Sequence, residues 1–163
     1  MALVRPSVLW KQMPIEKRVL AASAFWQDEH GIEQQLEAVV AIARKLKFRP
    51  KSVQQQPLER RAKQLAHFGE VSETIATRAL IAYHLTNERA MMGAFLDALG
   101  IAHENGLITA EDMPTPAPEK IASAATTLAA AFPADAVALY LNTLLTQDPD
   151  TWSALDGLPQ LNS

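Results

Sequence analysis

The chain has 163 residues, of which 48% are hydrophobic and 20% are charged, values typical of one folded domain with its own core and not of a disordered or fibrous protein. Cysteine is absent, which excludes disulfides, thiolate metal sites, iron–sulfur clusters and cysteine nucleophiles, and leaves His, Asp and Glu to bind any metal. The formal net charge of −3 is unevenly distributed, because residues 1–68 hold twelve Lys/Arg and six Asp/Glu, a net of +6, whereas residues 69–163 hold three and twelve, a net of −9.

This charge asymmetry favours an anionic partner or self-association, without identifying which. The N-terminal residues lack the apolar core of a signal peptide, and no apolar stretch approaches the ~18 to 20 residues that a membrane span needs. We therefore expect a soluble, cytoplasmic protein with no transmembrane segment.

Helical spacing dominates the first part of the chain. Pro14 suits the first turn of a helix, and the apolar residues after it predict a helix over 14–28. The next predicted helix, 32–47, repeats the spacing, and one over 57–68 is amphipathic with a basic outer surface. The three apolar faces consist of Ile15, Val19, Ala22 and Trp26; of Ile32, Leu36, Val39, Ala43 and Leu46; and of Leu58, Ala62 and Leu65.

The most apolar segment, residues 72–99, begins at a potential N-cap, Ser72, and ends before a potential C-cap, Gly100. It is apolar on nearly every side, which is typical of a helix that other helices surround. The sequence does not decide between one helix and two, because Asn87 is a possible second N-cap.

The last third of the chain combines turns with helical segments. Asn105-Gly106 predicts a turn within a loop over 101–108, residues 109–112 suit one helical turn, and the Pro-rich residues 113–118 predict a stiff linker. No segment alternates between apolar and polar residues, so no strand is predicted. Further helices are predicted over 121–132, 134–146 and 148–157.

Together these elements predict an all-α fold, an orthogonal or up-and-down bundle of about five to seven helices around residues 72–99. We expect one domain over residues 1–163. An alternative divides the chain into a helical bundle over 1–112 and a helical hairpin with a terminal helix over 119–163, joined by the linker 113–118.

Eight of the fifteen Lys and Arg residues fall within residues 44–63, where Glu59 is the only acid: Arg44, Lys45, Lys47, Arg49, Lys51, Arg60, Arg61 and Lys63. Such a basic face is typical of a site for nucleic acid, anionic lipid headgroups or an acidic protein surface. No known nucleic-acid-binding signature accompanies it, and Phe48 is its only aromatic residue. The cluster is also compatible with a solvated surface that complements helix dipoles, and with self-contact to the acidic half of the chain.

Five polar residues lie in the apolar segment, where polar groups are costly: Arg78, His84, Glu88, Arg89 and Asp97. On one continuous helix, His84 and Glu88 would share a face and could both bind a metal, with His103 as a further weak candidate. The chain has no Glu-x-x-His motif, so a ferritin-like dimetal site is not expected. The alternatives are a small-ligand pocket, acid–base catalysis, and a structural network in which the two arginines pair with the two acids.

Small residues form a seam on the same segment, beside Met91-Met92, which favours close helix packing in the core or in a dimer. The seam consists of Ala90, Gly93, Ala94 and Ala98. Glycine-rich phosphate loops, nucleophile elbows, His-Glu-x-x-His motifs and calcium loops are absent.

We therefore expect a non-enzymatic helical interaction protein that acts through its basic face, with a protein partner or self-association as a homodimer, and with no cofactor. The first alternative is binding of a polyanion, either nucleic acid or anionic lipid, through residues 44–63. The second alternative is a small-ligand or metal pocket around His84 and Glu88.

Overall fold

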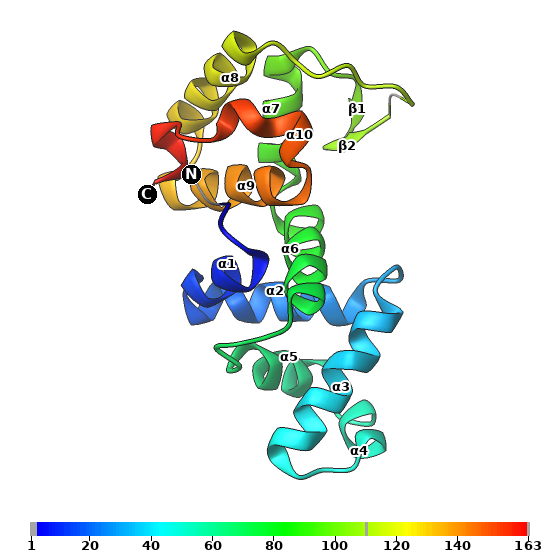
Figure 1. Cartoon of the computed structure of the whole chain (residues 1–163). Helices are drawn as coiled ribbons and strands as arrows, with labels where there is room; N and C mark the ends of the chain where they lie inside the picture. The colour runs from blue at the N-terminus through cyan, green and yellow to red at the C-terminus, as the bar shows by residue number, and fades with distance from the viewer. Residues whose placement is uncertain (1–2, 110, 163) are drawn as a thin grey trace. The chain divides into compact units, whose positions relative to one another are not determined.

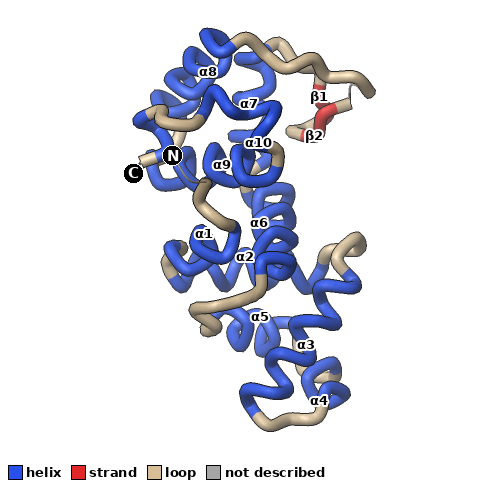
Figure 2. The backbone as a smooth tube through the Cα atoms, in the orientation of Figure 1, coloured by secondary structure: helices blue, strands red, loops and turns tan. Residues whose placement is uncertain are grey.

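Helices form almost all of the regular structure in the computed structural model, which describes residues 3–109 and 111–162 (Figure 1). The predicted all-α fold is confirmed, and a pair of very short strands is the only other regular structure drawn (Figure 2). The described residues form ten α-helices, more than the five to seven predicted, because two short helices were not anticipated and residues 72–99 form two helices. The helices are α1 Pro6–Gln12, α2 Ile15–Gln27, α3 Ile32–Leu46, α4 Pro50–Gln54, α5 Leu58–Ala66, α6 Glu73–Asn87, α7 Arg89–Leu99, α8 Pro118–Ala131, α9 Ala134–Gln147 and α10 Pro149–Trp152, followed by the 3₁₀ turns η1 Ser153–Leu155 and η2 Pro159–Leu161.

The described chain divides into two compact units. The N-terminal unit is Pro6–Asn87, and the C-terminal unit holds the described residues from Glu88 onward together with residues 3–5. The boundary thus falls between α6 and α7, whereas the Pro-rich residues 113–118 lie within the C-terminal unit. We predicted one domain over residues 1–163, and whether the two units fold as one cooperative domain stays a prediction.

The same boundary divides the charge. Residues 6–87 hold twelve Lys/Arg and eight Asp/Glu, a net of +4, and the rest of the chain holds three and ten, a net of −7, which together give the −3 of the whole. The positive charge of the chain therefore belongs to one structural unit.

In the N-terminal unit, α2 packs against α5 and α6, and α6 also packs against α1 and α3. Large side chains from five of these helices are fully buried: Trp10, Phe25, Ile42, Leu65 and Leu80. The Trp10 indole N–H donates a hydrogen bond of 2.8 Å to the Phe68 carbonyl oxygen, so its polar atom is paired inside the core. Apolar burial of this kind is the main force that holds the helices together.

The predicted core face of α3 is only partly right. Val39 and Ala43 are buried, but Ile32, Leu36 and Leu46 are exposed. The apolar residues of α3 cover more than one face of the helix, because Ala38, Val40 and Ile42 are apolar as well. Spacing alone therefore could not select the buried face.

The segment 72–99 forms two helices, because Glu88 leaves helical geometry with φ −129° and ψ 25°. α6 ends at Asn87 and α7 begins at Arg89, so the segment supplies one apolar helix to the core of each unit. The continuous helix on which a shared His84 and Glu88 face depended does not form.

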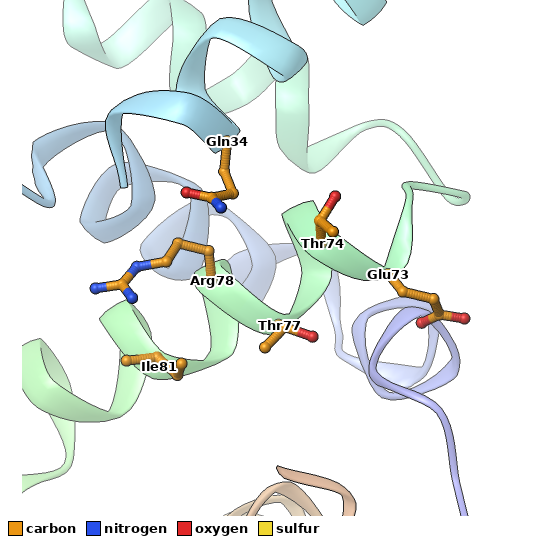
Figure 3. A pocket seen from close by; sticks show the side chains of 6 residues that line it. All are labelled: Gln34, Glu73, Thr74, Thr77, Arg78 and Ile81. Carbon is orange, nitrogen blue, oxygen red and sulfur yellow. The ribbon is translucent and has the colours of Figure 1, made fainter. Parts of the chain in front are cut away.

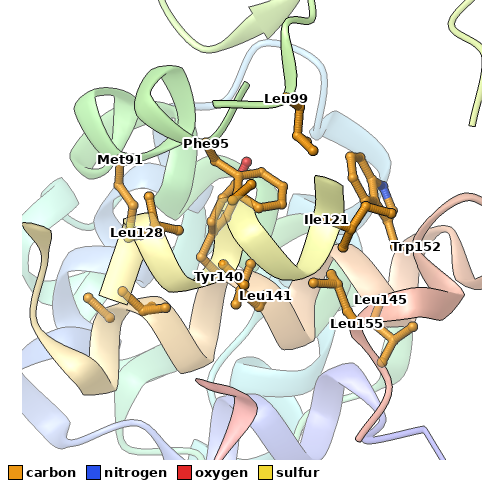
Figure 4. Close-up of a cluster of buried hydrophobic side chains, with 14 residues drawn as sticks. Met91, Phe95, Leu99, Ile121, Leu128, Tyr140, Leu141, Leu145, Trp152 and Leu155 are labelled. Atoms are coloured by element: carbon orange, nitrogen blue, oxygen red, sulfur yellow. The ribbon is translucent and has the colours of Figure 1, made fainter. Parts of the chain in front are cut away.

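In the C-terminal unit, α7 packs against α8, and α9 packs against α8, α10 and the two 3₁₀ turns. Figure 4 shows side chains from these elements converging on one apolar cluster. The Phe95 ring lies edge-on to Tyr140 and tilted against Trp152, with centroids 5.7 Å away in each case. Such aromatic contacts add to the stability gained from burial.

The prediction of no strand is wrong, because β1 His103–Glu104 and β2 Leu107–Ile108 form an antiparallel hairpin. Asn105 and Gly106 have φ values of 51° and 89°, as the two central residues of a type I′ hairpin turn require. The turn was predicted correctly, but strands of two residues are too short to show alternation. The predicted helical turn at 109–112 includes residue 110, which lies outside the described residues.

Candidate interaction surface

The basic segment is built from the end of α3, the connection to α4 and the start of α5. Arg44 and Lys45 occupy the last turn of α3, where cations complement the helix dipole. Lys47 ends the helix in the left-handed conformation, with φ 59°. Arg49 is extended, as the residue before a proline must be, and α4 starts at Pro50. The three residues 47–49 therefore connect the end of α3 to the start of α4.

Three of the eight cations have partners within the chain. The Lys45 ammonium lies 4.8 Å from the centre of the Phe68 ring, and the Arg61 guanidinium lies 5.1 Å from that of Trp26. Lys63 forms an exposed ion pair of 3.2 Å with Glu59. These contacts explain part of the basic cluster by local structure.

The other five cations are exposed and make no ion pair within the part of the chain that the structure describes: Arg44, Lys47, Arg49, Lys51 and Arg60. Leu46 and Phe48 stand among them with exposed fractions of 39% and 45%. Cations beside exposed apolar side chains are suited to a surface that carries both acids and apolar groups.

An open depression of about 700 Å³ lies beside the end of α3. Arg44 and Lys45 line it together with Phe68 and an exposed ion pair, Lys11 with Glu70, at 3.5 Å. The depression is open to solvent and does not enclose a ligand, so it extends the basic surface.

Arg78 pairs with an acid outside the predicted set of five polar residues, whereas the predicted structural network paired it with Glu88 or Asp97. Its Nε instead donates to Oδ2 of Asp28, which lies at the end of α2. Burial raises the pKa of Asp28, but the hydrogen bonds from Arg78 and from the His30 backbone, together with the charge of Arg78, outweigh this, so the net pKa is below its ordinary value. Asp28 also accepts from the backbone N–H of His30 at 3.0 Å. The pair therefore links α6 to the turn that precedes α3.

His84 is buried within the N-terminal unit, on the inner side of α6. Its Nδ1 lies 2.8 Å from the Leu80 carbonyl oxygen, the geometry of a ring N–H that bonds one helical turn back. Burial lowers the pKa of His84 to about 4, so the ring is neutral at pH 7.

Asp97 and Arg89 tie the hairpin to α7. His103 Nε2 lies 2.7 Å from Oδ1 of Asp97, and its Nδ1 accepts from the Gly106 backbone N–H at 3.1 Å. Arg89 donates to the carbonyl oxygen of Asn105 at 3.0 Å. Both ring nitrogens of His103 thus serve the local structure. Gly93, which belongs to the predicted small-residue seam, lies against His103, so this part of the seam helps the hairpin to pack on α7.

The five polar residues are divided between the two units, with Arg78 and His84 in the N-terminal unit and Glu88, Arg89 and Asp97 in the C-terminal unit. Among the described residues there is no group of three or more His, Asp or Glu side chains that could hold a metal ion. The metal-ligand candidates His84, Glu88 and His103 are not part of such a group within that part of the chain.

A second depression, of about 270 Å³, lies between α3 and α6 (Figure 3). Gln34 reaches from α3 toward Arg78, which is held by Asp28. At its other end, Glu73 accepts from the Ser7 backbone N–H at 2.8 Å and from the Ser7 hydroxyl at 2.9 Å, and so supports the start of α1. Both charged residues that line this depression, Arg78 and Glu73, therefore have structural roles.

An exposed strip along α3 was not predicted, because several of its residues were expected in the core. We call it the α3 strip: Glu29, Ile32, Glu33, Leu36, Val40, Arg44 and Lys47, all exposed. Within α3, the spacing of three and four places Ile32, Glu33, Leu36, Val40 and Arg44 on one helical face, while Glu29 lies in the turn before the helix and Lys47 is its C-cap. The sequence did contain a signal for this strip, because acids, apolar residues and cations follow one another at helical spacing.

No protein-family model matches the chain, and no curated protein and no solved structure matches it either. Among the described helices, none combines the length and the apolar character that crossing a membrane requires. The function is therefore inferred from the chain's own residues.

Proposed function

We propose that the protein is a non-enzymatic helical interaction protein of the cytoplasm, whose basic segment docks on an acidic surface of a protein partner or of a second copy of the chain. One observation carries this proposal. The five exposed cations of the basic segment make no ion pair within the described residues, and the exposed side chains of Leu46 and Phe48 lie among them.

The apolar neighbours favour a protein over a polyanion. A phosphate backbone gains from cations alone, whereas a protein interface also buries apolar side chains at its centre. Single-stranded nucleic acid is usually held by several stacking aromatic residues, and Phe48 is the only aromatic residue in this segment.

The polar side chains elsewhere support the non-enzymatic part of the proposal. Asp28 with Arg78 and Asp97 with His103 are paired and join neighbouring elements. A catalytic site needs titratable groups that converge on a space where a substrate can bind. These groups are instead engaged with one another.

The test compares the wild-type chain with a variant in which Arg44, Lys47, Arg49, Lys51 and Arg60 are all replaced by Gln. Each protein is immobilised and exposed to an extract of the source cells, and bound proteins are eluted with a salt gradient. Labelled RNA and DNA oligonucleotides are passed over the same columns at ~50 mM salt. A control replaces Lys120, an exposed cation of the C-terminal unit, by Gln.

We expect the wild-type chain and the control to retain an acidic protein, or the chain itself, and the fivefold variant to release it at lower salt. Retention of oligonucleotides with a steep salt dependence would show a polyanion-binding protein instead. Equal behaviour of all three chains would also contradict the proposal.

A further inference from the structure

The α3 strip changes character along its length. Its N-terminal end carries the acids Glu29 and Glu33, its centre carries Leu36 and Val40, and its C-terminal end carries Arg44 and Lys47. Ile32, Leu36 and Val40 have exposed fractions of 56%, 50% and 46%. Three large apolar side chains at successive helical turns on one exposed face are typical of a helix that packs against another surface.

The charges on this strip are not used within the chain. Glu29, Glu33, Arg44 and Lys47 take part in none of the ion pairs of the described residues. Glu37, on the adjoining side of α3, differs from them, because its carboxylate accepts hydrogen bonds from the Ser72 and Thr74 hydroxyls. The strip therefore offers both signs of charge to an external partner.

We propose that the α3 strip pairs antiparallel with the α3 strip of a second copy of this chain. The inference rests on the proposed function and names the partner that it leaves open. Reversing the direction of such a strip places its acidic end beside the basic end of the other copy, while the apolar centres meet. A two-fold axis at Ala38 sets this register, because residue 38 is midway between Leu36 and Val40.

In that register Leu36 faces Val40 of the second copy, and Arg44 comes beside Ile32 and Glu33 of the second copy. Lys47, at the C-cap of α3, and Glu29, in the turn before the helix, bring a second pair of opposite charges to the same two ends. Two-fold symmetry repeats each contact, so four pairs of opposite charge flank the apolar centre. A parallel arrangement would instead set acid beside acid and base beside base, which disfavours it.

The interface is small. α3 has 15 residues and is therefore about 22 Å long, and a single pair of such helices buries less than a standard protein–protein interface. The dimer should accordingly be reversible and depend on concentration. Sedimentation velocity from about 1 μM to about 500 μM covers the range in which such an association appears.

Charge reversal tests the pairing and its direction together. One variant carries Glu29→Lys and Glu33→Lys, and a second carries Arg44→Glu and Lys47→Glu. A control carries Glu104→Lys and Glu111→Lys, which are exposed in the C-terminal unit and change the net charge as much as the first variant does. Circular dichroism and thermal unfolding confirm that each chain is folded. Leu36→Ala with Val40→Ala tests the apolar centre without any change of charge.

We expect each reversed variant alone to dimerise at least about tenfold more weakly than the wild-type chain, because four attractions become repulsions. Their equimolar mixture should form a heterodimer of nearly wild-type affinity, and the control should behave as the wild type does. The alanine variant should also lose most of its self-association.

A wild-type chain that stays monomeric up to about 500 μM overturns this inference, as does a mixture of the reversed variants that fails to associate. If a monomeric chain still retains a different acidic protein through Arg49, Lys51 and Arg60, only the identity of the partner is wrong. If neither association occurs, the proposed function fails as well.

Discussion

His103 Nε2 lies 2.7 Å from Oδ1 of Asp97, across the junction between α7 and the hairpin. The same ring accepts the Gly106 N–H through Nδ1, so Nε2 must carry the proton and donate it in a hydrogen bond to Asp97. A Cβ atom on Gly93 would lie only 3.2 Å from Cε1 of His103, so the glycine lets the ring rest against α7. One histidine therefore joins both the strands and the turn to the helix.

Replacing His103 by Ala should release the hairpin. We expect the stability of the C-terminal unit to fall by about 1–2 kcal/mol and the Gly106 amide to exchange its hydrogen faster, because both ring hydrogen bonds are lost. Hydrogen–deuterium exchange with mass spectrometry measures this. Asp97→Asn is the matched control, since its amide oxygen still accepts from Nε2–H. Unchanged exchange at residues 103–108 in the alanine variant would show that the ring does not hold the hairpin.

His84 should make the protein less stable in mild acid. Burial lowers the pKa of this ring from 6.5 to about 4, although the Leu80 carbonyl bond opposes the shift and Lys17 adds to it. Between these values the unfolded chain binds a proton that the folded chain does not, so the free energy of unfolding decreases as the pH falls from 6.5 to 4. Across this window the free energy of unfolding should fall by roughly 3 kcal/mol in total. Above pH 6.5 His84 should cause no such decrease.

Thermal unfolding of the wild type and of His84→Leu, measured from pH 7.5 to 4, isolates this contribution. The leucine variant should have a flatter dependence of Tm on pH over the window, whatever its stability at pH 7.5. Parallel curves for the two proteins would mean that His84 does not titrate as its burial implies.

The Asp28–Arg78 pair should be coupled more strongly than a surface pair. Both side chains are partly buried, and Asp28 also holds the His30 N–H. In a double-mutant cycle with alanine at both positions, we expect a coupling free energy of about 1–2 kcal/mol. The same cycle on the exposed Glu59–Lys63 pair should give about 0.3–0.5 kcal/mol. Equal couplings in urea unfolding would argue against a structural role for Asp28 with Arg78.

The all-α fold was predictable because helical spacing and helix-end residues are local signals. Pro149 at the start of α10 and Gly100 at the end of α7 act within one or two turns of the chain. The Asn105-Gly106 turn is equally local. Its two strands were missed because each is only two residues long.

Contacts between distant residues were not predictable. Asp28 and Arg78 are 50 positions apart, and nothing in the sequence marks them as partners. The exposed face of α3 was misassigned for a different reason, since apolar residues cover more than half of the helix and the buried side depends on where α4, α5 and α6 pack. The basic segment can be read directly from the sequence as a count of Lys and Arg, but which of its cations lie over aromatic rings depends on Trp26 and Phe68, which lie outside it.

A photo-cross-link from position 48 asks directly whether the basic segment docks on a protein. Phe48 is replaced by p-benzoylphenylalanine, and the same replacement at Leu107, which is equally exposed at 45% but lies in the C-terminal unit, is the control. In an extract of the source cells, we predict a nuclease-resistant protein adduct at position 48 that weakens with salt and is absent at position 107. A nuclease-sensitive adduct, or equal cross-linking from the two positions, would contradict docking on a protein through this segment.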